Sequence, residues 1–204
     1  MLQMKGFAMI KMIIMGPPGS GKGTQAARIA EWFEIPAIST GDIFRQNIAE
    51  LTPLGIESKQ YIDNGDLVPD DLTNDMVRDR LGNPDVKNGF LLDGYPRTPQ
   101  QVGELDSMLA IENQHLTAAL LLTADDKELV KRLLDRAKVT GRSDDTDLVI
   151  RHRLDLYHEQ TEPVVAMYAE RGLLLTVNGD GEVDEVTERI LAHIQKPPLL
   201  LSGQ

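Results

Sequence analysis

The stretch Gly16-Pro17-Pro18-Gly19-Ser20-Gly21-Lys22-Gly23-Thr24 decides how this chain folds. An apolar run at residues 12–15 precedes it, and residues 25–33 after it carry apolar side chains at helical spacing. A glycine-rich loop between a strand and a helix can bind phosphate, because its backbone N–H groups and the helix dipole both face the anion. Lys22 adds a positive charge for the β- and γ-phosphates. The pattern Gly-x4-Gly-Lys-[Ser/Thr] is met with one departure, since Gly23 takes the Ser/Thr position and a threonine follows. A glycine-rich turn that binds nothing is the alternative, and the flanking strand and helix argue against it.

The length and composition favour one large α/β domain with insertions. The chain has 204 residues, of which 41% are hydrophobic and only 4% aromatic, so aliphatic side chains must fill the core. It has no cysteine, which excludes disulfides, thiolate zinc sites and a thiol nucleophile and suits a cytoplasmic protein. A net charge of −11 argues against a nucleic-acid partner, and no apolar window is long enough to span a membrane. The first apolar run is expected to be a buried strand behind a frayed segment 1–8, because Lys11 interrupts it and no signal-peptide cleavage site follows.

Helical and strand patterns alternate along the chain, which predicts a parallel sheet with helices on both faces. The expected strands are residues 12–15, 35–38, 90–93, 118–122 and 173–177. The expected helices include one that begins at 39–42 with capping residues, one at 125–136, one that starts near Thr146 and one over 183–194. Between residues 50 and 71 prolines and glycines break the pattern, which predicts an inserted subdomain of short helices. Residues 197–204 are expected to form a disordered tail.

Charged residues gather where such a sheet binds its ligands. Asp93 ends a buried strand and Arg97 follows in the next turn, at the carboxyl edge of the sheet. Asp93 is expected to orient a magnesium ion, or else to cap the next turn. Arginine binds phosphate bidentately, and phosphoryl transfer depends mainly on alignment and charge stabilisation. Five arginines occupy loop or helix-end positions around the expected phosphate site: Arg45, Arg97, Arg136, Arg142 and Arg153.

No side chain stands out as a general base, and this bears on the acceptor. A hydroxyl nucleophile usually needs a positioned carboxylate, whereas a phosphate monoester, with a second pKa of about 6, is already anionic at neutral pH. The pattern therefore favours a phosphate group as acceptor. Asp144 and Asp145 either cap the helix that follows or hold Arg142 and its neighbours. The four histidines lack metal-ligand spacing and are expected to be structural: His115, His152, His158 and His193.

Five stretches in this order resemble the adenylate kinase family along nearly the whole chain. They are Gly16-Pro-Pro-Gly-Ser-Gly-Lys-Gly-Thr-Gln25, Ile38-Ser-Thr-Gly-Asp42 with Arg45, Asn64-Gly-Asp-Leu-Val-Pro-Asp70, Gly89-Phe-Leu-Leu-Asp-Gly-Tyr-Pro-Arg-Thr98, and Thr140-Gly-Arg-Ser-Asp-Asp145 with Arg153. Glycine at position 23 is the form that this family uses. The resemblance implies the reaction Mg·ATP + AMP ⇌ 2 ADP, carried out by a monomer.

The resemblance also implies a division into three parts. A P-loop core with a five-stranded parallel sheet would comprise residues 1–38, 69–136 and 148–204, an insertion at 39–68 would bind the nucleoside monophosphate, and 137–147 would form a mobile lid. The lid would exclude water and bring Arg136 and Arg142 to the site. Many bacterial members have a longer lid, some with zinc held by cysteines. Here only five residues separate Arg136 from Arg142 and the chain has no cysteine, so a short lid without zinc is expected.

Individual roles follow from the same resemblance. ATP would be bound by Gly19, Ser20, Gly21, Lys22, Gly23, Thr24, Arg132 and Gly181, with Arg132 stacked on its adenine. AMP would be held by Thr40, Arg45, Asp66, Val68, Gly94, Arg97, Gln101, Arg142 and Arg153, with Thr40 and Gln101 near its adenine. The catalytic cations would be Lys22, Arg97, Arg136, Arg142 and Arg153, while Asp93 would orient Mg²⁺ through water.

Two other functions are compatible with a phosphate-binding loop. A kinase for UMP or CMP would typically have alanine in place of Thr40 and asparagines near Arg97, whereas this chain keeps Thr40, Thr98 and Gln101. A switch protein that binds ATP or GTP and signals to a partner would need a water-positioning residue and a base-specificity motif, and no convincing candidate is present. AMP is therefore the predicted acceptor.

Overall fold

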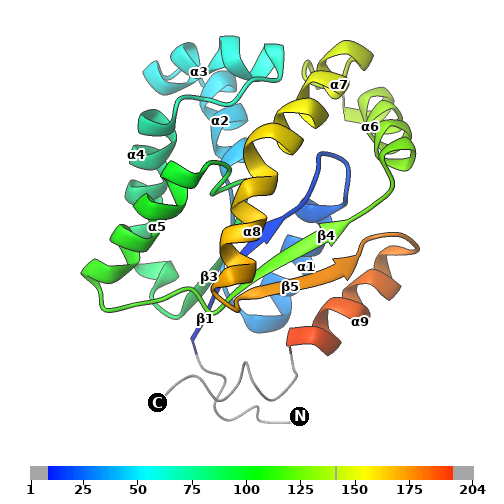
Figure 1. Cartoon of the computed structure of the whole chain (residues 1–204). Coiled ribbons are helices and arrows are strands. Elements are labelled where there is room, and N and C mark those ends of the chain that lie inside the picture. Colours follow the sequence, from blue (N-terminus) through cyan, green and yellow to red (C-terminus); the bar gives the residue numbers. More distant parts are fainter. Residues whose placement is uncertain (1–8, 141, 195–204) are drawn as a thin grey trace.

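The computed structural model describes residues 9–140 and 142–194 and has an α/β fold built on a five-stranded parallel sheet (Figure 1). The strands are β1 (Ile10–Met15), β2 (Ala37–Ser39), β3 (Gly89–Asp93), β4 (Ala118–Thr123) and β5 (Leu174–Asn178). Their order is β2-β3-β1-β4-β5. The predicted fold class is confirmed, and each predicted strand matches an observed one to within two residues. Because the chain places β3 on one side of β1 and β4 on the other, a crevice forms at the carboxyl ends of these strands.

The central strand β1 is buried along its whole length, as both faces of a parallel sheet are covered. Successive side chains point to opposite faces. Ile13 and Met15 therefore enter one apolar cluster, while Met12 and Ile14 enter another. This explains why the strand is a continuous apolar run and shows no alternation with polar residues.

Helices cover the sheet on both sides. One face packs against α1 (Lys22–Phe33) and α9 (Val183–Ile194). The other packs against α4 (Asp70–Leu81), α5 (Pro99–Ile111) and α8 (Glu162–Glu170), and the short helix η1 (Pro84–Val86) leads from α4 into β3. The buried residues of α9, Val186, Ile190 and Ile194, recur at helical spacing, as expected of an amphipathic helix with one face on the core.

Two helices, α2 (Thr40–Ala49) and α3 (Pro53–Asn64), form the insertion between β2 and β3, at the top of Figure 1. Each starts at the residue type that favours a helix start. The hydroxyl of Ser39 accepts a hydrogen bond from the Asp42 N–H, and that of Thr52 accepts one from the Gly55 N–H. The insertion thus has short helices, as the proline and glycine pattern predicts.

After β4 the chain forms α6 (Asp126–Thr140) and α7 (Asp147–Leu156). The π-helical turn η2 (Tyr157–Thr161) then connects α7 to α8. Helices α6 and α7 share a small core of Leu129, Leu133, Ile150 and Leu154. The prediction that the first of these helices ends at residue 136 is wrong, because residues 137–140 contain no proline or glycine and the helix continues through them.

The expected frayed segment 1–8 and the expected tail 197–204 lie outside the described residues. Within the described part of the chain, no helix combines the length and the apolar character needed to cross a membrane.

Candidate active site

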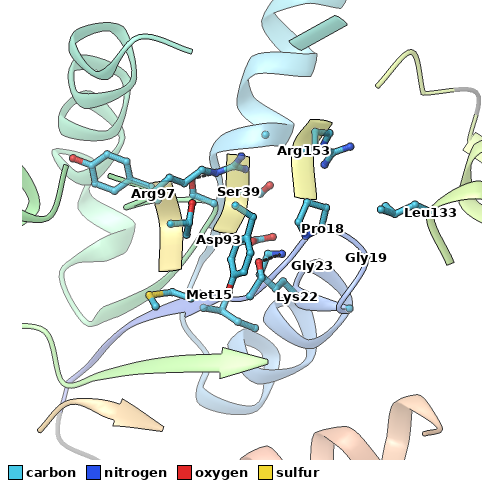
Figure 2. Close-up of a pocket in the computed structure, with 18 of the residues that line it drawn as sticks. Met15, Pro18, Gly19, Lys22, Gly23, Ser39, Asp93, Arg97, Leu133 and Arg153 are labelled. Atoms are coloured by element: carbon cyan, nitrogen blue, oxygen red, sulfur yellow. Dashed lines mark hydrogen bonds between the residues drawn. The ribbon is translucent and has the colours of Figure 1, made fainter. Parts of the chain in front are cut away.

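A cavity of about 600 Å³ opens at the carboxyl ends of β1 and β3. It is lined by the glycine-rich loop and the start of α1, the start of α2, the turn after β3, helix α6 and helix α7. Figure 2 shows Lys22 beside Asp93, with Arg97 and Arg153 on either side of them. The sheet therefore gathers charged side chains from segments that lie far apart in the sequence.

The glycine-rich loop follows β1 and leaves the start of α1 open to a ligand. Gly19 has a φ of +86°, and a Cβ there would lie 2.9 Å from the Leu129 carbonyl oxygen. Gly21 precedes the helix with a φ of 90°, and no side chain caps it. The first N–H groups of α1 therefore stay available, which together with the helix dipole makes an anion site.

Lys22 lies at the floor of this anion site. Its Nζ donates to the carbonyl oxygens of Gly16 at 2.7 Å and Pro17 at 2.8 Å. Burial lowers the pKa of Lys22 to about 8, an effect that Asp93 opposes and that nearby arginines reinforce. An anion bound here would favour the charged form of the lysine.

Asp93 ends β3 and faces Lys22 across the cavity floor (Figure 2). Burial raises the pKa of this carboxyl group, and Lys22 and Arg97 oppose the shift. Among the described residues its carboxylate takes no hydrogen bond and forms no ion pair, so it is available to a ligand.

A magnesium ion suits this carboxylate. Mg²⁺ is typically bound by one or two carboxylates together with phosphate oxygens and water. Residues 9–140 and 142–194 contain no group of three or more His, Cys, Asp or Glu side chains that could hold a metal by themselves. Asp93 and the hydroxyl of Thr24, which also lines the cavity, would therefore act on an ion that arrives with a nucleotide.

All five arginines singled out in the sequence line the same cavity, although they come from four separate helices or turns and the segment between α6 and α7: Arg45, Arg97, Arg136, Arg142 and Arg153. Burial, reinforced by Arg153, lowers the pKa of Arg97, whose Nε donates to the Gly94 carbonyl oxygen at 2.9 Å. Burial also lowers the pKa of Arg153. This concentration of positive charge in a chain of net charge −11 indicates an anionic ligand.

Asp144 and Asp145 hold two of these arginines in place. Arg136 forms a bidentate pair with Asp145, with both N···O distances at 2.7 Å, and Arg153 donates to Asp144 at 2.8 Å. Burial alone would lower the pKa of Arg136, but the hydrogen bonds that Arg136 donates to Asp145, together with the negative charges of Asp145 and Asp144, outweigh it and raise that pKa. Of the two readings open at the sequence level, holding arginines is the one observed, since Thr146 caps α7.

The partner of Arg142 differs from the expected Asp144 or Asp145. Arg142 itself lies 3.8 Å from Asp42, which also accepts a hydrogen bond from Arg45 at 2.6 Å. Sequence reasoning missed Asp42 as a residue of the site. Its position three residues after the end of β2 was the signal that could have found it.

A second hollow of about 40 Å³ adjoins the cavity beneath α2. It is lined by six of the residues expected to hold AMP: Thr40, Asp66, Val68, Gly94, Arg97 and Gln101. Its volume holds a few water molecules but no purine. A nucleobase could enter only if this hollow became wider.

Four of the expected site residues have less direct positions. Arg132 lines the main cavity and donates to the Gly179 carbonyl oxygen at 3.2 Å, which brings it close to the turn that contains Gly181. Neither Gly181 nor Ser20 lines the cavity, and Ser20 is buried without a hydrogen-bond partner for its hydroxyl. Asp66 lies 2.6 Å from His152, so its carboxylate contacts α7.

The segment between α6 and α7 also touches the insertion directly. The Ser143 hydroxyl donates to Asp63 on α3 at 2.7 Å. Gly65, which ends α3 with a φ of +79°, leaves room for Arg153, because a Cβ there would lie 2.9 Å from the Arg153 Cγ. Sequence reasoning missed Gly65, although the Asn-Gly pair at 64–65 is a turn signal.

Comparison with known proteins identifies this arrangement. The family model described as adenylate kinase matches residues 14–173, which is most of the chain. The chain belongs to the adenylate kinase family. The adenylate kinase of Pseudarthrobacter chlorophenolicus is 65% identical over 92% of this chain and 97% of its own length. The adenylate kinases of Kocuria rhizophila and Bifidobacterium longum are 60% and 50% identical, over 92% and 91% of this chain and the whole of their own lengths.

These relatives settle the class of reaction. This adenylate kinase is a phosphotransferase with a phosphate group as acceptor, as the lack of a general base predicts. The relatives favour neither a UMP or CMP kinase nor a non-catalytic switch.

Proposed function

We propose that this adenylate kinase binds Mg·ATP and AMP on opposite sides of the cavity and transfers the terminal phosphoryl group between them, giving two ADP. The observation that carries the proposal is the convergence of Lys22 and six arginines on one cavity, where Asp93 is the one lining carboxylate without a partner among the described residues. A reaction between two polyanions needs this excess of positive charge.

The donor side is the glycine-rich loop. We assign the phosphates of ATP to residues 19–24, which end in the start of α1 that no side chain caps, with Lys22 on the β- and γ-phosphates. Arg132 would stack on the adenine near Gly181, a role supported by its hydrogen bond to the same turn. Magnesium, when bound with ATP, neutralises phosphate charge, and Asp93 would hold its water ligands.

The acceptor side is the second hollow and its mouth. Thr40, Val68 and Gln101 would surround the adenine of AMP, with Asp66 and Gly94 at the edges. Arg45 and Arg97 would bind the AMP phosphate, which would place it opposite the terminal phosphate of ATP. The AMP phosphate is the nucleophile and is already anionic, so no side chain has to remove a proton.

The transfer itself would use the buried cations. Lys22, Arg97, Arg136, Arg142 and Arg153 are fixed donors that can follow the negative charge on the equatorial oxygens as the bond to the donor breaks. Asp144 and Asp145 keep two of these guanidinium groups in position before a nucleotide arrives. The geometry is therefore prepared in advance, and catalysis would cost little reorganisation.

We further propose the division into a core, an insertion at 39–68 and a short lid at 137–147. Lid closure is a known motion of adenylate kinases and keeps water from competing with AMP for the phosphoryl group. The contacts of Ser143 with Asp63 and of Arg142 with Asp42 support a closed arrangement here. A monomeric state and a cytoplasmic location remain predictions from the sequence.

The test of the acceptor is direct. The protein is mixed with Mg·ATP and, separately, with AMP, UMP, CMP or buffer, and ADP is measured. We expect rapid ADP formation with AMP and rates close to the buffer control with the other two. If AMP gave no more ADP than buffer, the proposed function would be wrong.

A further inference from the structure

The side-chain amide of Gln101 has both of its ends occupied by the protein. Its Oε1 accepts a hydrogen bond from the backbone N–H of Arg97 at 2.7 Å, and its Nε2 donates to Asp70 Oδ1 at 2.6 Å. The other carboxylate oxygen of Asp70 accepts a hydrogen bond from the Thr98 hydroxyl at 2.8 Å. Gln101 is only 2% exposed, so these partners, and not solvent, decide which way the amide faces.

Only one orientation of this amide satisfies its partners. Reversing it would set the oxygen of Gln101 against the Asp70 carboxylate and its NH₂ group against the Arg97 N–H. A carboxylate has only acceptors and a backbone N–H is only a donor, so both hydrogen bonds would be lost. Asp70 is the first residue of α4, where the helix dipole favours negative charge.

The fixed orientation leaves a defined pattern facing the second hollow, which Gln101 lines. One lone pair remains on Oε1 and one N–H remains on Nε2. Adenine offers an amino donor at C6 next to the acceptor N1, and hypoxanthine and guanine offer the reverse, an acceptor O6 next to a donor N1–H. Thr40, which also lines the hollow, agrees with this pattern, because its hydroxyl already donates to the Gly94 carbonyl oxygen at 3.0 Å and can therefore only accept from a base.

We infer that Asp70 is a positioning residue that makes the acceptor site select a 6-aminopurine over a 6-oxopurine, by fixing the orientation of the Gln101 amide. The inference rests on the proposed AMP site. Asp70 is not among the described residues that line the second hollow. It would therefore act on the base through Gln101, to which it is hydrogen-bonded. A site with fixed donors and acceptors rejects the mismatched base because its own buried groups would be left unpaired.

The experiment compares Asp70→Ala with Asp70→Asn, using AMP and IMP as acceptors and kcat/KM as the readout. Alanine removes the acceptor for Gln101 Nε2, and we expect the ratio of kcat/KM for AMP to that for IMP to fall about tenfold. Asparagine keeps an acceptor for Gln101 while its NH₂ can donate to the Thr98 hydroxyl, so the ratio is expected to stay within about threefold of the original. The KM for ATP and the thermal midpoint of unfolding are measured for each variant.

A purely structural role for Asp70 gives a different result. Loss of charge at the start of α4 would affect both variants, and it would lower AMP and IMP turnover together with the thermal midpoint. That outcome, or an unchanged ratio in Asp70→Ala, overturns the inference. Gln101→Ala separates this failure from a failure of the proposed site: if Gln101→Ala lowers the ratio and Asp70→Ala does not, only the inference fails. If Gln101→Ala leaves AMP turnover unchanged, the proposed AMP site itself is wrong.

Discussion

Lys22 lies in surroundings that oppose its own charge. It is buried next to arginines, and Asp93 and two backbone carbonyl oxygens are the compensating groups among the described residues. Burial lowers the pKa of Lys22 to about 8, so the folded protein does not favour the charged form. Such a perturbed lysine in a cavity indicates a functional role, here the binding of an anionic ligand. The residue therefore carries information about function that its place in the loop pattern alone does not give.

Replacing Lys22 tests this directly. Lys22→Met keeps most of the side-chain volume but removes the charge near the transferring phosphoryl group, and we expect kcat to fall on the order of 10²-fold or more. The same change relieves a desolvation penalty, so the thermal midpoint of the free protein is expected to rise. Steady-state kinetics and a thermal melt check both effects. A variant with normal turnover would contradict the assigned role.

Thr40 provides the corresponding test of the acceptor side. Thr40→Ala removes the hydroxyl that faces the second hollow, and we expect the KM for AMP to rise about tenfold while the KM for ATP changes less than about twofold. Thr40→Ser is the matched control, because it keeps the hydroxyl that bonds to the Gly94 carbonyl oxygen. Equal weakening of both substrates by Thr40→Ala would mean that the acceptor site lies elsewhere.

At the scale of helices and strands, the sequence predicted what depends on local pattern. Apolar runs located all five strands, and the capping serine located the start of α2. The pattern could not predict contacts that the fold makes between distant segments. The pairing of Asp145 with Arg136 needs α6 and α7 to pack together, and the contact of Asp42 with Arg142 needs the insertion to meet the segment that follows α6. Both depend on tertiary packing, which leaves no periodic signal in the chain.

Another contact between distant segments predicts how the insertion and the segment after α6 act together. The hydroxyl of Ser143, which follows α6, donates a hydrogen bond to Asp63 on α3. If it helps to hold the site closed, Ser143→Ala should raise the KM for both nucleotides about two- to threefold and increase ATP hydrolysis in the absence of AMP, because closure excludes water.

The control for this contact is Ser107→Ala, which removes an exposed serine hydroxyl on α5 that donates to the Gly103 carbonyl oxygen of its own helix. A double-mutant cycle with Asp63→Ala measures the coupling, since contacting residues have non-additive effects. Additive effects, or hydrolysis unchanged from the control, would mean that this contact has no part in closure.

Over the whole molecule, charge is divided unevenly between the surface and the cavity. The chain carries 32 acidic and 21 basic residues, yet the cavity gathers Lys22 and six arginines around Asp93, a carboxylate with no partner among the described residues. The acidic exterior favours solubility, while the cavity attracts polyphosphates. The fold thus keeps positive charge where it costs stability, and pH should affect stability and activity in opposite directions.

The direction in which stability changes with pH follows from the pKa of Lys22. Its pKa is about 8 in the folded protein and 10.5 ordinarily, so between these values the unfolded chain binds a proton that the folded protein does not. The contribution of Lys22 to the free energy of unfolding therefore rises with pH across this window. Over the same window kcat/KM for ATP should fall, because the free enzyme loses the charge that binds phosphate.

The measurement is the difference in unfolding free energy between the natural chain and Lys22→Met, taken at several pH values from about 7 to about 10, since other titrating groups cancel in the difference. We expect the natural chain to be the less stable of the two at pH 7 and to approach the variant as the pH rises. A difference that stayed constant across the range would show that Lys22 keeps its ordinary pKa, and the fall in kcat/KM would then need another cause.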